Sequence, residues 1–237
     1  MTIGNELARI KTAKENIKNS IIAKGGTVAD EKLDQYPAII DILPEDLFSK
    51  HLSYEGYFEG EPVVFFGFGV GDVYIPDTLN GLTITDIRDG LFTASNITSV
   101  RLPAGLTVIY TRAFYGSSKL KTVEFNPALT NIAPESFYYC PLIQSVDLST
   151  TQIKRINYSA FQHCQGLTTV KFPPTLTVIG KSAFANTAIS GILTLPDNMW
   201  AVESMAFANT QITEVSIPST CTYQADSFPA GAVITTR

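Results

Sequence analysis

The chain has 237 residues, of which 45% are apolar and 16% are charged, and its net charge is −5. The acidic balance and the lack of clustered Lys and Arg exclude a nucleic-acid-binding face. The longest nearly apolar run, residues 63–70, contains two glycines. It is far shorter than the roughly 20 residues of a membrane-spanning helix, so the sequence excludes membrane insertion.

Residues 1–45 are predicted to form a small helical N-terminal module. Between residues 3 and 24 the apolar residues follow a heptad spacing that Gly25 and Gly26 end. They are Ile3, Leu7, Ile10, Ile17 and Ile21. A second short helix is expected over residues 30–42. Two interpretations stay open: a helical pair docked on or tethered to the rest of the chain, or a homo-oligomerising coiled coil formed through these five residues.

Residues 46–72 are predicted to be an N-terminal cap with strands. The segment is rich in aromatic residues, and residues 63–66 (VVFF) follow a Gly-Glu-Pro turn. One or two strands here are expected to cover the open edge of the first repeat, because an exposed edge invites aggregation. An aromatic surface that stacks on carbohydrate is the alternative.

Residues 73–237 contain a repeat of about 23 residues. A phenylalanine recurs at intervals of 21 to 24 residues, at Phe92, Phe114, Phe137, Phe161, Phe184, Phe207 and Phe228. An apolar or aromatic residue lies five positions before each one, at Ile87, Ile109, Ile132, Ile156, Ile179, Val202 and Tyr223. Further upstream lies an apolar-x-apolar pair, which Pro follows directly in five repeats.

These features predict a solenoid. The alternating pair is typical of a short strand, which Pro ends because it has no N–H to donate to a ladder. The segment from Ile to Phe is predicted to be a returning turn. One unit cannot bury both of its apolar sides alone, so neighbouring units must stack. We therefore expect an α/β solenoid of the leucine-rich repeat class, with about seven coils and short parallel strands on one face.

The repeat resembles the BspA-like leucine-rich repeat family over residues 70–230. The matching residues are LKTVEF at 120–125, LTNI at 129–132 and SFYYC at 136–140, followed by LTTVKFP at 167–173, LTVIG at 176–180 and Ala183-Phe184. The resemblance implies a bacterial surface or host-associated protein that acts in adhesion or protein binding. The first residues lack the basic and apolar regions of a signal peptide, so the cytoplasm and a phage particle are alternatives to surface display.

Residues 3–43 also resemble a short module at the start of phage or prophage tail-associated proteins. The matching elements are an Ala-Lys pair, Lys-Gly-Gly at 24–26 and Tyr-Pro-Ala-Ile-Ile at 36–40. This resemblance implies a second possible function, a structural component of a tail-like particle that oligomerises through the N-terminal helix.

Catalytic and metal-binding groups are sparse. The two histidines, His51 and His163, have no repeated partner, and no phosphate-binding loop or paired carboxylates recur. Cys140 and Cys164 occupy the same repeat position in adjacent coils, where a small buried residue is expected; a disulfide is the alternative. The sequence predicts a protein that is not an enzyme and that has no cofactor and no metal site.

The outward side of the strands is the predicted ligand-binding surface. The residues between the apolar pairs are Tyr74, Arg101, Glu124, Asp147, Lys171, Thr194 and Ser216. In register, Arg101 neighbours Glu124 and Asp147 neighbours Lys171, and a row of Ser and Thr residues runs beside them. This surface is interpreted either as a self-satisfied polar sheet face or as a site for a protein or glycan ligand.

Overall fold

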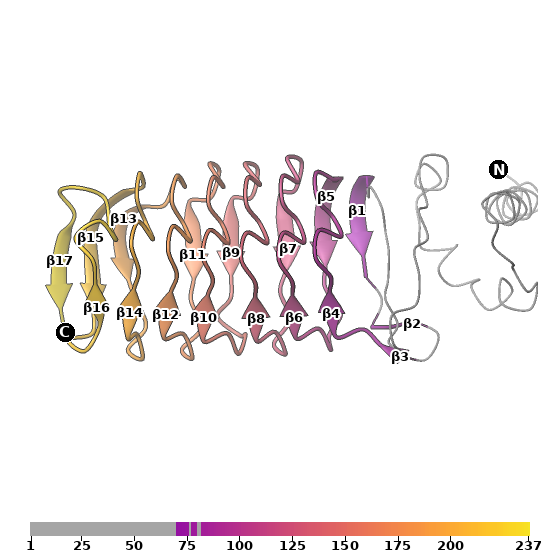
Figure 1. Ribbon diagram of the computed structural model, residues 1–237, viewed down its shortest axis with the longest axis horizontal. Helices are drawn as coiled ribbons and strands as arrows, with labels where there is room; N and C mark the ends of the chain where they lie inside the picture. Colours follow the sequence, from indigo (N-terminus) through magenta and orange to yellow (C-terminus); the bar gives the residue numbers. More distant parts are fainter. Residues whose placement is uncertain (1–69, 76, 80–81) are drawn as a thin grey trace, which may run out of the picture. The chain divides into compact units, whose positions relative to one another are not determined.

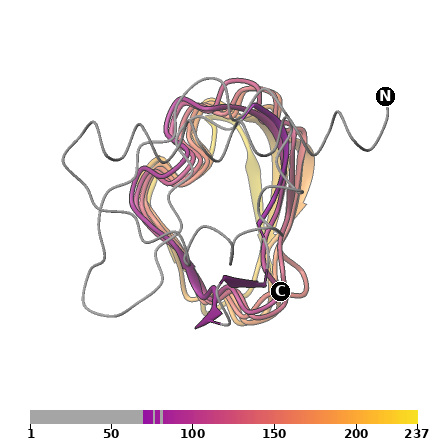
Figure 2. The same cartoon turned by 90° about the vertical axis from the view of Figure 1, so that its right-hand side faces the viewer.

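The computed structural model describes residues 70–75, 77–79 and 82–237. These residues form a β-solenoid of seven coils, each coil carrying one strand on each of two faces (Figure 1). Viewed along the axis, the coils superpose closely (Figure 2). The coils are numbered 1 to 7 along the chain. Each contains one core phenylalanine, from Phe92 in coil 1 to Phe228 in coil 7. The coil number of about seven and the period confirm the repeat analysis.

The first face carries parallel strands at the predicted positions. They are β1 (Val70–Tyr74), β5 (Asn96–Arg101), β7 (Thr122–Glu124), β9 (Ser145–Asp147), β11 (Thr169–Lys171), β13 (Ser190–Thr194), β15 (Gln211–Ile217) and β17 (Val233–Thr236). We call the outward side of these strands the strand face. An antiparallel pair, β2 (Thr78–Leu79) with β3 (Leu82–Thr83), follows β1.

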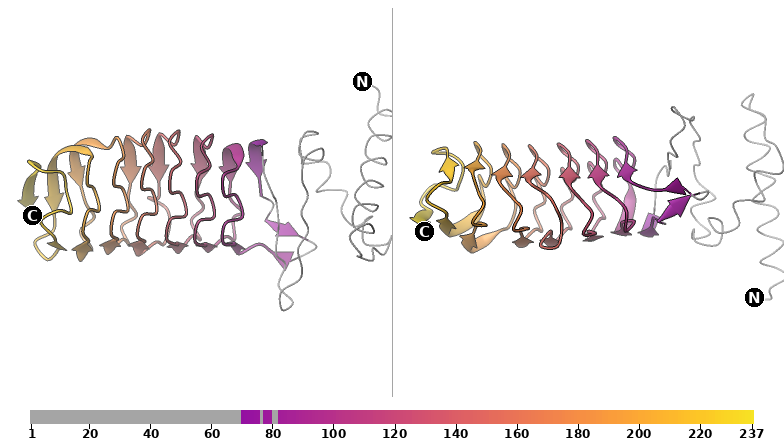
Figure 3. Two further views of the ribbon diagram at one scale, coloured as in Figure 1. Left: turned by 45° about the horizontal axis from the view of Figure 1, so that its top comes forward. Right: turned by 90° about the horizontal axis from the view of Figure 1, so that it is seen from below.

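A second parallel sheet runs along another side of the coils (Figure 3). Its two-residue strands are β4 (Asp86–Ile87), β6 (Val108–Ile109), β8 (Asn131–Ile132), β10 (Arg155–Ile156), β12 (Val178–Ile179), β14 (Ala201–Val202) and β16 (Thr222–Tyr223). The expectation of strands on one face only was therefore wrong. The segment predicted to be a returning turn starts with a strand, because its isoleucine points inward while its backbone pairs with the next coil.

No helix occurs within the described residues, so their architecture is all-β rather than α/β. The predicted helical module of residues 1–45, including the five heptad residues, lies outside the described part, as does most of the predicted cap of residues 46–72. Within the described part of the chain, no helix is long and apolar enough to cross a membrane.

The core is built from stacked columns of identical side chains. Neighbouring core phenylalanines lie face to face, with ring centroids 4.9 to 5.6 Å apart along all seven coils. The isoleucine five residues earlier forms a second buried column, for example Ile109, Ile132 and Ile156. This stacking explains why the offset between the two residues does not vary along the sequence.

The first-face sheet is interrupted at two places, after β7 and after β11. These two strands are followed by Phe125 and Phe172, where the other coils have Leu or Ile. Each ring packs edge-on against a core phenylalanine, at 5.9 Å from Phe137 and 5.8 Å from Phe184. The leucines at this position bond to the next coil, as Leu148 N–H does to the Lys171 carbonyl. The larger rings thus coincide with the breaks in the ladder.

The segment around each of the first six core phenylalanines makes a tight turn with two left-handed residues. They lie two positions before and two positions after the phenylalanine, as Glu135 (φ 56°) and Tyr139 (φ 56°) do around Phe137. As a result, alternate N–H groups point along the axis. The Phe137 N–H, for example, donates to the Ala160 carbonyl of the next coil at 2.9 Å. We call the seven residues from three before to three after the phenylalanine the turn segment.

Candidate functional site

The predicted column of residues is assembled along the first-face strands. Backbone register places Tyr74 beside Arg101 and Arg101 beside Glu124. Further along, Asp147 is beside Lys171, and Thr194 is beside Ser216. The two breaks in the sheet therefore divide the predicted site into three groups of neighbours rather than one continuous ladder.

Both predicted charge pairs form ion pairs. Lys171 Nζ lies 2.8 Å from Asp147 Oδ2, and Arg101 Nε lies 3.9 Å from Glu124 Oε2. The four side chains are exposed, so each pair adds about 1 kcal/mol or less to stability. The Lys171 ammonium, helped by the hydroxyl and N–H of Ser149, lowers the pKa of Asp147 to about 2. The carboxylate is thus charged over the whole physiological range.

A depression of about 200 Å³ lies at the end of the strand face formed by β1, β5 and β7. Its lining residues are Asp72, Val73, Ser99, Val100, Arg101, Thr122 and Glu124. Asp72 accepts hydrogen bonds from Thr98 Oγ1 at 2.7 Å and from Ser99 Oγ at 2.6 Å, which lower the pKa of its carboxyl. Two carboxylates and a guanidinium group thus line the depression.

Asp72 was not among the predicted site residues. It lies beside Ser99 because the register of β1 against β5 shifts by one residue between Gly71 and Asp72. A shift of this kind is a β-bulge, and it moves the side chains that follow to new neighbours. Only the glycine before Asp72 gives a sequence signal for it.

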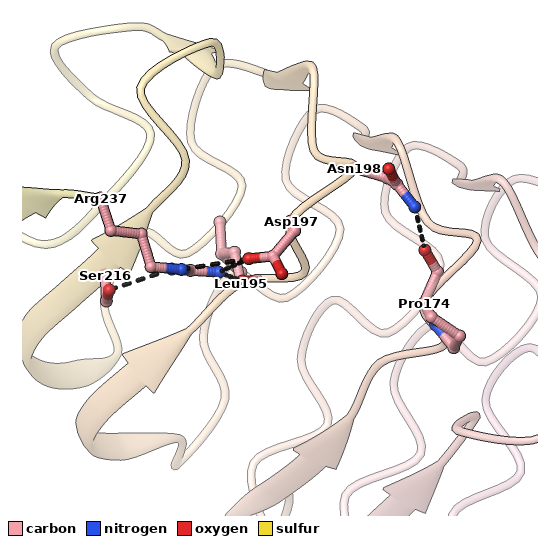
Figure 4. A network of polar contacts seen from close by, with 6 residues as sticks. All are labelled: Pro174, Leu195, Asp197, Asn198, Ser216 and Arg237. Carbon is pink, nitrogen blue, oxygen red and sulfur yellow. Dashed lines mark hydrogen bonds and ion pairs between the residues drawn. The ribbon is translucent and has the colours of Figure 1, made fainter.

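At the other end of the strand face, Arg237 contacts the predicted site residue Ser216 (Figure 4). The guanidinium group donates to Ser216 Oγ at 3.0 Å and to the Leu195 carbonyl, and it pairs with Asp197 Oδ1 at 2.8 Å. Nearby, the Asn198 amide donates to the Pro174 carbonyl at 2.9 Å. Ser216 is therefore part of a structural network that joins the last coils.

The strand face has the groups for polar recognition. His163 lies in the turn segment of Phe161, away from the strands, and His51 lies outside the described residues. The part of the chain that the structure describes contains no group of three or more His, Cys, Asp or Glu that could hold a metal ion. What the face offers is hydroxyl, carboxylate, ammonium and guanidinium groups on a rigid sheet.

Cys140 and Cys164 lie in matching positions of adjacent coils, as the repeat predicts. Both are buried free thiols, and each donates to the carbonyl of the previous core phenylalanine at 3.1 Å. Ser117 makes the same contact with the Phe92 carbonyl at 2.7 Å. This geometry agrees with a repeat position that takes a small buried residue. The structure has no disulfide between Cys140 and Cys164.

The comparisons with known proteins agree with the solenoid. The family model for the BspA type leucine-rich repeat region matches residues 85–194 and 191–229, with six copies. No curated protein matches the chain.

Among solved structures, a leucine-rich cell surface protein of Faecalibacterium prausnitzii A2-165 is 25% identical with a TM-score of 0.64, over 78% of this chain and 55% of that one. The T. pallidum leucine-rich repeat protein TpLRR is 21% identical with a TM-score of 0.53, and the match covers 66% of this chain and 85% of that protein. The pneumococcal vaccine antigen PcpA is 23% identical with a TM-score of 0.53, and the match covers 65% of this chain and 41% of that protein. The chain thus spans about half or less of two of these proteins.

Proposed function

The chain belongs to the BspA-type leucine-rich repeat family, and on that premise we propose that it is a non-enzymatic binding or adhesion protein whose strand face holds a polar protein or glycan ligand. The observation that carries the proposal is the exposed pattern of opposite charges, Arg101 with Glu124 and Lys171 with Asp147, on a rigid parallel sheet. Solvent-exposed pairs of this kind contribute little to folding, so stability alone does not account for them.

The electrostatics of the face favour a specific polar partner over a generally charged surface. Each of the two cations, Arg101 and Lys171, is adjacent to an anion, so the face presents opposite charges side by side and no continuous basic strip. An interface of this type selects its partner by the match of the charge pattern. The depression between Asp72 and Glu124 adds a concave point at which a ligand group can enter.

The relatives support a location at the bacterial surface. One solved structure with a similar fold is described as a cell surface protein, and another as a vaccine antigen. The structural role in a phage or prophage tail receives no support from the matches, and it rests on residues 3–43, which the structure does not describe.

A charge reversal tests the proposal. We expect Arg101→Glu with Lys171→Glu to reduce capture of ligands from an immobilised panel of purified serum and matrix proteins, mucin and oligosaccharides, without lowering the melting temperature. The matched control is Lys119→Glu with Lys154→Glu, which changes the net charge equally at two exposed residues away from the strand face. If every ligand of the unmodified chain binds both variants equally well, the strand face is not the binding surface.

A further inference from the structure

Three consecutive turn segments, those of Phe114, Phe137 and Phe161, carry a concentration of aromatic side chains. We call this set the tyrosine patch, and it consists of Tyr115, Tyr138, Tyr139, Tyr158 and His163. The equivalent positions after the phenylalanine in the flanking coils hold small side chains: Thr93, Ala94, Ala185, Asn186, Ala208 and Asn209. The rings are therefore no requirement of the repeat, since the same backbone forms without them.

The centre of the tyrosine patch is held rigidly by ring contacts. Tyr115 and Tyr138 stack with centroids 4.9 Å apart, and the guanidinium group of Arg112 covers Tyr115 at 5.6 Å. The His163 ring meets Tyr138 edge-on at 5.3 Å. These contacts fix the rings without help from a ligand, which lowers the entropy cost of binding one.

The two outer tyrosines have accessible ring faces. Tyr139 is 49% exposed and Tyr158 is 48% exposed. Tyr139 makes one tilted contact, with the His163 ring at 6.3 Å, and no ring of the described residues stacks on Tyr158. The rigid centre is thus bordered by two rings that a ligand can cover.

The backbone of Tyr139 is in a conformation that a tyrosine rarely adopts. Its φ is 56°, and the same position is Ala94, Gly116, His163, Asn186 or Asn209 in other coils. Glycine and asparagine tolerate the left-handed region best, and a large side chain there is less favourable. The repeat therefore forms this turn with several residue types, and it does not require the exposed Tyr139 ring.

Charge does not select the ligand of this surface. Arg112 and Glu135 are the only charged residues in the three turn segments, and Arg112 Nε lies 2.6 Å from Glu135 Oε2. The two charges cancel across neighbouring coils. The remaining polar groups are the tyrosine hydroxyls, the His163 imidazole and the Gln162 amide, which suit a neutral ligand with many hydroxyl groups.

The size of the patch favours a small ligand over a protein. Ring centroids in adjacent coils lie 4.9 and 5.1 Å apart along the core, and seven extended residues reach at most roughly 23 Å. Three coils therefore cover on the order of 300 Å², against about 800 Å² per partner in a standard protein interface. We propose that the tyrosine patch is a binding site for a neutral oligosaccharide, distinct from the strand face, with sugar rings packed on Tyr139 and Tyr158.

The test uses the intact chain and an array of neutral hexose and N-acetylhexosamine oligosaccharides, with calorimetry for those that bind. We expect Tyr139→Asn with Tyr158→Ser to weaken binding at least tenfold. The fold tolerates the first change, because Asn occupies that position in two other coils. Tyr158→Ser alone is the second variant if the double variant melts at a lower temperature, and Trp200→Ser is the control, since Trp200 is 67% exposed beside the second sheet.

The proposal is overturned if the array shows no neutral oligosaccharide bound, or if those bound are unaffected by the tyrosine substitutions. Binding of acidic glycans alone overturns it as well. If the substitutions weaken binding of a protein and leave sugars unaffected, the patch belongs to a protein interface and the assignment to a sugar is wrong. Equal loss in the Trp200→Ser variant also contradicts it, because the effect is then not confined to the patch.

Discussion

Nζ of Lys171 lies 2.8 Å from Oδ2 of Asp147, across the ladder that joins β9 to β11. The pKa of the Asp147 carboxyl is about 2, because it accepts hydrogen bonds from Lys171 and from the hydroxyl and N–H of Ser149. The first prediction concerns this value. Lys171→Met should raise the pKa of Asp147 only part of the way to its ordinary value, since Ser149 still donates, and a carboxyl NMR titration measures the change.

The linked stability effect has a defined sign. The folded pKa of Asp147 lies below the ordinary value of 3.8, so its stabilising contribution is complete above about pH 4 and is lost as the pH falls towards 2. Exposure limits the effect to about 1 kcal/mol or less. Arg101→Met is the control, because its partner is Glu124; a pKa of Asp147 that does not respond to Lys171→Met contradicts the ion pair.

The second prediction concerns position along the phenylalanine column. Phe161 stacks between Phe137 at 5.1 Å and Phe184 at 5.4 Å, whereas Phe228 has a single stacked neighbour. We expect Phe161→Ala to lower the free energy of unfolding by about 3–5 kcal/mol and Phe228→Ala to lower it by less. Urea denaturation followed by circular dichroism measures both, and a larger loss at Phe228 contradicts the stacked-coil account.

The third prediction uses the left-handed turn positions. Met205 has a φ of 56° and an exposed side chain. A left-handed conformation costs a residue with a Cβ about 1–2 kcal/mol, and glycine avoids this cost. Glycine also has more conformational entropy in the unfolded chain, which offsets about 0.5–1 kcal/mol of the gain. Met205→Gly should therefore raise the free energy of unfolding by about 0.5 kcal/mol.

Ala208→Gly is the matched control, because Ala208 is in the same turn segment and is not among the residues with positive φ. This change should destabilise by about 0.5–1 kcal/mol. Opposite signs for the two glycines, measured by thermal melting, support the left-handed turn, and equal signs contradict it.

The repeat spacing predicted the features that burial imposes. A phenylalanine such as Phe137 and an isoleucine such as Ile132 recur because each must face the interior in every coil. The repeat spacing therefore predicted the number of coils, the first-face strands and the pairing of Lys171 with Asp147. The second sheet did not follow. Its strands have two residues, as in Asn131–Ile132, which is shorter than the alternation needed to recognise a strand.

Other features have little or no signal in residue type. The left-handed turns are formed by residues as different as Arg112, Glu135 and Met205, because neighbouring coils hold the backbone through hydrogen bonds. Asp72 reaches the strand face through a shift in register. Arg237 reaches the Asp197 carboxylate and Ser216 by the length of its side chain, which sequence spacing does not describe.

The fourth prediction concerns the three thiols. Burial raises the pKa of Cys164 to about 12 and that of Cys140 well above its ordinary value, and the neighbouring Cys164 raises the latter further. Because the thiolate is the reactive form, roughly one Cys164 thiol in ten thousand is ionised at pH 8. Cys221 is less enclosed, and burial raises the pKa of its thiol to a smaller degree.

With an aromatic disulfide reagent at pH 8, Cys221 should therefore react first in the folded chain, and Cys140 and Cys164 should react only as the chain unfolds. Cys221→Ser removes the early phase and serves as the control. Cys140→Ser should keep the fold, because Ser117 fills the equivalent slot and donates to the Phe92 carbonyl. Early reaction of Cys140 contradicts a pair of sealed thiols. A native mass two hydrogens short, with neither Cys140 nor Cys164 reacting on unfolding, indicates instead that the two coils are joined by a disulfide.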